Sequence, residues 1–346
     1  MQRQLLPAVR IAGCGWAREP AQLVLCFLPP ARAIRYLSKL RQERIGLIGD
    51  TLSQEGFDLA LLQEVWSERD YCELKQKLTA PYPYSHYFKS GVIGSGLCVF
   101  SRYPILDTFL YQYSLNGYPY MLQHGDWFCG KAVGLLVIKI CGIMCHVYVT
   151  HLHAEYCRDK DAYLPHRVVQ AWELAQFIQH TSKGADVVLL GGDLNMHPGD
   201  VGIRLLRDWT GLRDSFADTE RFEGCEDGCT LVPANCFTVK EELQPFPLGI
   251  RIDYILYKVR AAQRGGRGLS GSGPSHTHSL FSRLLSIASK NSPSRDVFVW
   301  LEQGTLLPGS HCSLWDTEQQ TSLPSSGPHP MAGRGGAVGR TAQGPA

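Results

Sequence analysis

Polar side chains of the kinds that serve metal-assisted hydrolysis lie at the ends of four apolar runs in the sequence. They are Glu64, His151, the pair Asp193 and Asn195, and Asp253. One carboxylate after an apolar run is often a helix cap or an ion-pair partner with no part in chemistry. Four such groups in one chain are harder to explain in that way, and together they favour an active site.

Carboxylate and amide oxygens beside a histidine suit a hard divalent cation and a phosphate ester. Magnesium binds oxygen ligands and keeps several waters, so one or two carboxylates are enough to hold it. The Asp-x-Asn spacing predicts that both side chains lie on one side of an extended segment. Asp193 would then handle a proton or orient water, and Asn195 would donate to a phosphoryl oxygen. The histidines would stabilise the charge that develops as phosphorus becomes five-coordinate.

The elements that must position these residues alternate between strands and helices over residues 36–258. Apolar runs predict strands at 57–63, 96–101, 132–140, 143–152, 186–191 and 251–257, and helical spacing predicts helices at about 37–52 and 159–182. The runs on either side of Cys141 and Gly142 favour an antiparallel hairpin. Mixed strands with helices between them predict a layered α/β domain with polar residues at the ends of its sheets.

Four motifs give this pattern a specific resemblance. The strings are Leu62-Gln63-Glu64-Val65-Trp66, Thr150-His151-Leu152, Gly192-Asp193-Leu194-Asn195 and Arg251-Ile252-Asp253-Tyr254. In this order they resemble motifs of the endonuclease/exonuclease/phosphatase superfamily. The segments 124–134 and 150–156 narrow the resemblance to neutral sphingomyelinases, and it covers about residues 36–258. It implies a four-layer α/β/β/α sandwich, in which the first and last core strands depart here from the family pattern.

The resemblance also implies a role for each polar residue. Glu64 resembles the magnesium ligand, and His151 resembles the residue that stabilises the transition state. Asp193 and Asn195 resemble the proton-handling and phosphate-binding pair. Asp253 resembles the carboxylate that orients a catalytic histidine supplied later in the chain.

A loop before the predicted hairpin carries a second implied function. In the resembled family an aspartate and a lysine, here Asp126 and Lys131, form a contact that gates the active site, and we group His153 with them. The alternative is a solvated loop pair worth under about 1 kcal/mol. Glycines at 125, 130 and 134 would make this loop pliable enough for a gate.

Aromatic residues near these motifs offer a way to hold a choline headgroup by cation–π contact. The residues are Tyr118, Tyr120, Trp127 and Tyr156. Core packing is the alternative reading for each of them.

By resemblance, the activity is magnesium-dependent hydrolysis of sphingomyelin to ceramide and phosphocholine, with phosphocholine lysophospholipids as further substrates. The partner would be such a lipid at a membrane surface, and no protein partner is inferred. A nuclease of the same fold is the alternative, but the formal net charge of +2 gives no basic surface for nucleic acid.

Location in the cell is predicted from the family and from the cysteines. The family implies an intracellular protein on the cytosolic face of membranes. Of the 12 cysteines, eight lie in or beside apolar runs without zinc spacing, so we expect mostly buried free thiols in a reducing compartment. Cys225 and Cys229 give only weak support to a zinc site, because no second pair lies near them. No apolar run reaches the length of a membrane span, so a cytosolic protein is a further expectation.

The two ends of the chain depart from the family. Residues 1–35 are divergent, and the segment 9–16 lacks the asparagine that helps to bind metal in the family. Residues 259–346 are rich in Gly, Ser and Pro, so we expect a largely disordered tail beyond a catalytic domain at 36–258. The family's closing Ser-Asp-His motif is missing, which predicts impaired turnover. These ends suggest a splice product, and a non-catalytic binding or regulatory variant is a further alternative.

Overall fold

The computed structural model describes residues 6–7, 10–11, 21–27, 41–121, 124–218, 230, 246, 249–260 and 297–298. Within these residues the helices are α1 (Arg41–Glu55), α2 (Glu68–Leu78), α3 (Leu164–Thr181) and α4 (Val201–Thr210), with a short 3-10 helix, η1, at Asp126–Phe128. The longer strands are β3 (Ala21–Phe27), β4 (Leu59–Gln63), β5 (Tyr84–Phe88), β6 (Leu97–Ser101), β7 (Ile105–Gln112), β8 (Ala132–Ile140), β9 (Ile143–His151), β10 (Val187–Asp193) and β12 (Asp253–Val259). The two-residue strands are β1 (Leu6–Pro7), β2 (Arg10–Ile11), β11 (Arg213–Asp214) and β13 (Val297–Phe298).

Two mixed sheets form the centre of the fold. One has six strands in the order β11-β12-β10-β9-β8-β7, and the other has five in the order β2-β3-β4-β6-β5. In the first sheet β9 and β10 run parallel, whereas β8 is antiparallel to both of its neighbours, β7 and β9. The connection from β9 to β10 passes through α3, as a parallel pair requires.

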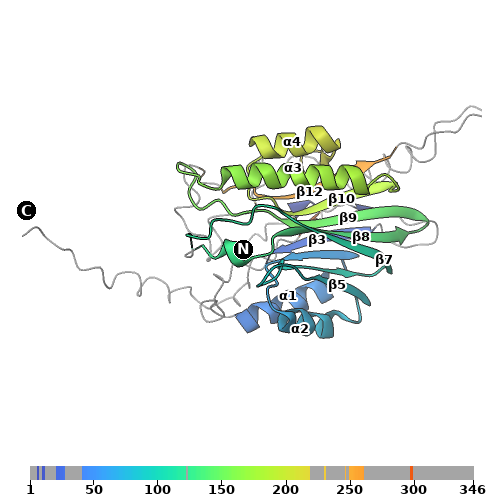
Figure 1. Cartoon of the computed structure of the whole chain (residues 1–346). Helices are drawn as coiled ribbons and strands as arrows, with labels where there is room; N and C mark the ends of the chain where they lie inside the picture. Colours follow the sequence, from blue (N-terminus) through green and yellow to red (C-terminus); the bar gives the residue numbers. More distant parts are fainter. Residues whose placement is uncertain are drawn as a thin grey trace, which may run out of the picture. The chain divides into compact units, whose positions relative to one another are not determined.

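The fold has four layers, with α3 and α4 on one side of the two sheets and α1 and α2 on the other (Figure 1). Three apolar clusters fill the spaces between the layers, and the cluster between the sheets joins side chains of β4 and β6 to those of β8, β9 and β10. A second cluster packs α3 and α4 against the outer face of the six-stranded sheet, and a third packs α1 and α2 against the other sheet. The predicted four-layer α/β/β/α sandwich is therefore confirmed.

Most predicted strands appear close to their expected positions because they are buried on both faces. All residues of β4, β6 and β10 are buried, which explains their continuous apolar runs. The predicted hairpin is confirmed as β8 and β9, and its turn has positive φ at Cys141 and Gly142. The helix predicted at 159–182 begins later, at Leu164, with a proline in its first turn.

The divergent N-terminal segment contributes a strand that was not predicted. The apolar run Ala21–Phe27 forms β3, which pairs in parallel with β4. Two residues of the segment 9–16, which lacks the family's asparagine, form β2, and the other residues of that segment lie outside the described residues. In the predicted disordered tail, β13 pairs with β1, and the rest from residue 261 onward lies outside the described residues.

The described cysteines only partly match the expectation of buried thiols. Six of them are free; Cys98, Cys129 and Cys145 are buried, whereas Cys72, Cys141 and Cys157 are exposed. In the part of the chain that the structure describes, no helix combines the length and the apolar character that crossing a bilayer requires.

Candidate active site

Strand register brings three of the predicted site residues to one level of the six-stranded sheet. Asp193, the last residue of β10, is paired with His151 of β9 on one side and with Asp253 of β12 on the other. Residues paired across neighbouring strands point to the same face of a sheet. Glu64 follows the last residue of β4 in the other sheet, and its Oε1 lies 3.1 Å from Nδ1 of His151. The site therefore lies where the two sheets meet at one end.

Backbone strain marks two of these residues. Glu64 has φ 64° and Asn195 has φ 47°, and among the described residues the one other non-glycine residue with positive φ is Cys141 in the β8–β9 turn. Left-handed backbone is costly for residues with a side chain and is commonly retained at functional sites. It also corrects the expectation of an extended Asp-x-Asn segment. The chain turns at Asn195, whose backbone N–H donates to Oδ1 of Asp193 at 2.8 Å.

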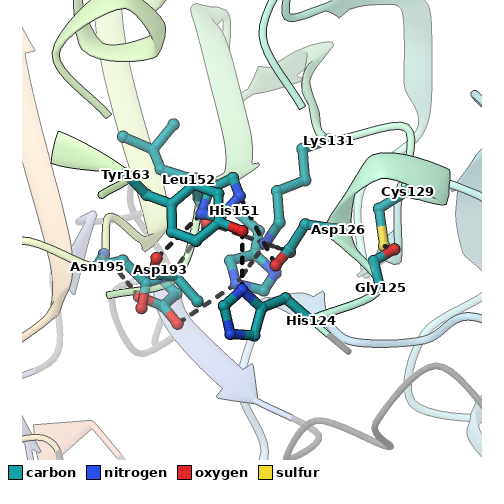
Figure 2. A network of polar contacts seen from close by, with 12 residues as sticks. His124, Gly125, Asp126, Cys129, Lys131, His151, Leu152, Tyr163, Asp193 and Asn195 are labelled. Carbon is teal, nitrogen blue, oxygen red and sulfur yellow. Dashed lines mark hydrogen bonds and ion pairs between the residues drawn. The ribbon is translucent and has the colours of Figure 1, made fainter. Parts of the chain in front are cut away.

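His151 lies at the centre of the site and contacts three charged side chains. Its Nε2 lies 3.6 Å from Oδ2 of Asp193 and 3.1 Å from Nζ of Lys131 (Figure 2). Its Nδ1 faces Glu64. An ammonium group can only donate, so Nε2 accepts from Lys131 and Nδ1 carries the hydrogen that faces Glu64. The histidine thus lies between the carboxylate of one sheet and the carboxylate of the other.

The carboxyl group of Asp193 is buried, with 1% of the residue exposed. Burial raises its pKa above the ordinary value, although His151 and the backbone N–H of Asn195 oppose that shift. A carboxyl group that takes up a proton more readily than usual is suited to proton transfer. The environment of Asp193 is therefore compatible with the predicted proton-handling role.

Asn195 and Lys131 hold the same backbone carbonyl. Nδ2 of Asn195 and Nζ of Lys131 both donate to the oxygen of Leu152, each at 3.0 Å. Leu152 directly follows His151, so these bonds fix the position of the histidine. The amide nitrogen of Asn195 has a second hydrogen that can be directed to a ligand.

Asp253 takes part in a different set of contacts. Its Oδ2 accepts a hydrogen bond from the hydroxyl group of Thr230 at 2.9 Å. The Oγ1 atom of Thr230 in turn accepts a hydrogen bond from the backbone N–H of Ile252 at 3.0 Å. Thr230 was not predicted as a site residue, because a threonine in a loop carries no signal in the sequence. The catalytic histidine that Asp253 is expected to orient is not among the described residues.

The pair formed by Asp126 and Lys131 is buried, which excludes the solvated alternative. The residues are 6% and 2% exposed, and Nζ of Lys131 lies 3.8 Å from Oδ1 of Asp126. Burial alone would raise the pKa of Asp126, but Lys131, His153 and the hydroxyl of Tyr156 lower it below the ordinary value. The carboxylate is therefore held in its charged form inside the protein, beside the candidate site.

His153 completes the same cluster. It is 0% exposed, and its Nε2 lies 3.6 Å from Oδ2 of Asp126. Burial lowers the pKa of His153 to about 3. Its Nδ1 lies 2.9 Å from the carbonyl oxygen of Ala154, which can only accept, so the neutral ring carries its hydrogen there and Nε2 has none.

Two of the three loop glycines serve close packing, not pliability. A Cβ at Gly130 would lie 2.5 Å from the backbone of Ser90, and one at Gly134 would lie 2.5 Å from the ring of Phe88. Gly125 has φ 75° and precedes η1. The loop is therefore packed against the segment that contains Ser90. Gly130 and Gly134 give no support to the hinge that was inferred from the glycine content.

Tyr156 holds the loop through its hydroxyl group. Its Oη donates to Oδ2 of Asp126, and its ring stacks on His124 with 3.9 Å between centroids. Sequence reasoning considered this tyrosine for a choline headgroup and missed the bond to Asp126. The contact explains part of the lowered pKa of Asp126.

We expect Tyr156→Phe to lower the free energy of unfolding by about 1.5–3 kcal/mol, because a buried carboxylate loses a hydrogen bond while the ring stacking remains. Chemical denaturation monitored by circular dichroism measures this change. Tyr120→Phe is the control, since Tyr120 is 70% exposed, and it should change stability by less than about 0.5 kcal/mol. Equal effects of the two substitutions would contradict the role given to the Tyr156 hydroxyl.

The donor set around Glu64 fits a hard cation that keeps water ligands. Its Oε2 accepts a hydrogen bond from Nε1 of Trp66 at 2.5 Å, and Oε1 faces His151. Among the described residues there is no group of three or more His, Cys, Asp or Glu side chains arranged to hold a metal. Magnesium is commonly held by one or two carboxylates with water completing its coordination, so Glu64 suits it as a ligand.

Comparison with known proteins agrees with the predicted resemblance. Residues 34–289 match the model of the Endonuclease/Exonuclease/phosphatase family. The chain is 64% identical over 226 residues to sphingomyelin phosphodiesterase 2 of Mus musculus, a match that covers 65% of this chain and 54% of the relative. The resemblance to neutral sphingomyelinases is therefore confirmed, and the chain spans about half the length of the curated relatives it matches.

Solved structures support the fold. Sphingomyelinase C from Streptomyces griseocarneus has a TM-score of 0.56 at 19% identity, and the match covers 69% of this chain and 85% of that chain. A beta toxin variant from Staphylococcus aureus with bound magnesium ions has a TM-score of 0.51 at 18% identity, with 68% and 82% covered. At these identities the likeness concerns the fold alone. The match to the family model covers more than half of the sequence, and the chain belongs to the Endonuclease/Exonuclease/phosphatase family.

Proposed function

We propose that the described domain is the catalytic core of a magnesium-dependent sphingomyelin phosphodiesterase, which releases ceramide and phosphocholine. The observation that carries the proposal is the position of His151 between Glu64 of one sheet and Asp193 of the other. The 64% identity to a sphingomyelin phosphodiesterase supports the substrate class. Lysophospholipids with a phosphocholine headgroup are further substrates by the same headgroup chemistry.

Each residue of the site has a part in this reaction. Glu64 would hold magnesium, which when bound neutralises charge on the phosphate. Asn195 donates its second amide hydrogen to a phosphoryl oxygen, and Lys131, which contacts His151, places positive charge beside it. Asp193 orients the attacking water or handles a proton of the reaction. The water oxygen forms a bond to phosphorus, the bond between phosphorus and the ceramide oxygen breaks, and that oxygen takes up a proton as ceramide leaves.

The buried Asp126–Lys131 pair supports a positioning role for the loop, and the proposed gate would act through it. Lys131 contacts both Asp126 and His151, so a change in the loop reaches the candidate site in one step. Low net charge gives no support to a nuclease. We place the lipid at a membrane surface, as its apolar tails require, and the cytosolic face of intracellular membranes remains the proposed location.

Glu64→Ala is expected to abolish the rise in melting temperature that magnesium produces, because the cation loses its carboxylate ligand. Differential scanning fluorimetry with and without magnesium measures this effect without any need for turnover. Glu68→Ala is the matched control, because Glu68 is an exposed glutamate in the same region that pairs with Lys89. A magnesium-dependent shift that persists in Glu64→Ala would remove Glu64 from the ligand set.

A further inference from the structure

Two neighbouring loops present large apolar side chains to solvent. Val92 is 88% exposed, Trp127 is 49% exposed and Phe128 is 40% exposed. Val92 lies in the segment 90–94, and the two aromatic residues lie in η1. We call these three residues the apolar rim. Exposed apolar side chains that gather on one surface commonly mark an interaction site.

The two loops are joined by backbone contacts, so the rim has a fixed support. The N–H of Gly130 donates to the carbonyl of Gly94 at 2.8 Å, and the N–H of Ile93 donates to the carbonyl of Phe128 at 3.2 Å. Gly91 lies so close to Gly130 that a Cβ there would be 2.6 Å from its Cα. The apolar side chains are therefore presented by a packed pair of loops, not by one flexible segment.

The rim is continuous with the candidate site on two sides. Trp127 directly follows Asp126, whose carboxylate lies 3.8 Å from Lys131. On the other side, the segment after Val92 packs on Trp66, because a Cβ at Gly96 would lie 3.2 Å from the indole ring. Trp66 in turn donates to Glu64. The two loops that present the rim to solvent therefore also contact residues of the candidate site.

We infer that the apolar rim inserts into the interfacial region of a bilayer of zwitterionic choline phospholipids and so places the candidate site over the headgroups. The inference rests on the proposed function, which requires a lipid substrate. Tryptophan is well suited to the membrane interface, where an apolar ring and an N–H group are both accommodated. The charged neighbours Lys89 and Glu68 form an ion pair at 3.0 Å, which leaves little net charge to favour anionic lipid.

Vesicle binding tests this inference without any turnover. The full chain is sedimented with sucrose-loaded phosphatidylcholine vesicles that contain no sphingomyelin, in EDTA. Val92→Ser/Trp127→Ser should lower the partition coefficient roughly tenfold or more, because two exposed apolar side chains no longer enter the lipid. Val92→Ser alone should lower it about threefold, Val92→Leu should leave it unchanged, and added salt should have little effect.

The matched control is a pair of exposed aromatic residues on other elements of the fold. Phe109 on β7 and Trp209 on α4 are 58% and 46% exposed, and Trp209 packs against Trp172 of α3. Phe109→Ser/Trp209→Ser should change vesicle binding less than twofold. Melting curves check that both double variants are folded, and the single change at Val92, which is 88% exposed, keeps the test independent of folding.

The outcomes separate the rim from the proposed function. Unchanged vesicle binding by both rim variants would overturn the inference, and a loss confined to the Phe109/Trp209 variant would move the lipid contact to those residues. The second protein to assay is a chimera in which the residues after Lys258 are replaced by the corresponding segment of the mouse relative. If vesicle binding depends on the rim but this chimera does not hydrolyse sphingomyelin, the inference is supported while the proposed function fails. If the chimera hydrolyses sphingomyelin and the rim variants bind vesicles as well as the parent, the proposed function stands and the inference about the rim is wrong.

Discussion

The 346-residue chain is expected to release phosphocholine from sphingomyelin roughly 10²- to 10⁴-fold more slowly than a chimera in which residues after Lys258 are replaced by the corresponding segment of the mouse relative. By family resemblance, the base for the attacking water is the histidine of a closing Asp-His motif. The chain contains no Asp-His dipeptide at any position.

Radiolabelled sphingomyelin in mixed micelles, with magnesium, measures both rates, and micelles reduce any dependence on membrane binding. A chimera in which the grafted motif histidine is replaced by alanine is the matched control and should be as slow as the chain itself. Comparable turnover by the chain and the chimera would contradict the assignment of the base. It would direct attention to His276 and His278, which lie outside the described residues.

Asp193→Asn in the chimera is expected to lower turnover by roughly 10²-fold or more while lipid binding is retained. Asparagine has the shape of aspartate, and its oxygen can still accept the hydrogen bond from the backbone of Asn195. It cannot take up a proton, which is the function that burial and the raised pKa of Asp193 favour. The loss should therefore appear in kcat, with little change in the apparent affinity for substrate.

Asp58→Asn provides the matched control for this substitution. Asp58 is also buried, at 7% exposure, but it pairs with Arg102 and with the hydroxyl of Tyr103, away from the site. Its substitution should lower the free energy of unfolding and leave kcat within about twofold of the parent. A loss of stability away from the site does not alter the chemical step in the molecules that remain folded. Turnover by Asp193→Asn near the parent value would show that Asp193 has a structural role.

Much of the fold followed from the sequence because its central strands are buried on both faces. β4, β6 and β10 combine short apolar runs with polar residues at the end, and the register of β9, β10 and β12 then places His151, Asp193 and Asp253 side by side. Edge strands gave weaker signals. Only the last residue of β5 is fully buried, and β7 alternates irregularly between exposed and half-buried positions, so neither was predicted.

The details of the site depended on tertiary contacts that spacing does not encode. The depth of Asp126 and Lys131 is set by packing between loops, so a pair that could have been solvated is buried beside His151. The left-handed turn at Asn195 and the bond from Tyr156 to Asp126 also arise from the folded state. β3 was missed because an apolar run in divergent surroundings has no family motif to identify it.

The most direct test of the central claim is product analysis in water enriched in oxygen-18. The chimera, which contains Glu64, His151, Asp193 and Asn195 of this chain, is incubated with sphingomyelin and magnesium, and the products are identified by mass spectrometry. The account predicts ceramide together with phosphocholine that carries one oxygen-18 atom, and no product in EDTA or with Glu64→Ala. Release of free choline with ceramide phosphate, or equal product formation in EDTA, would contradict it.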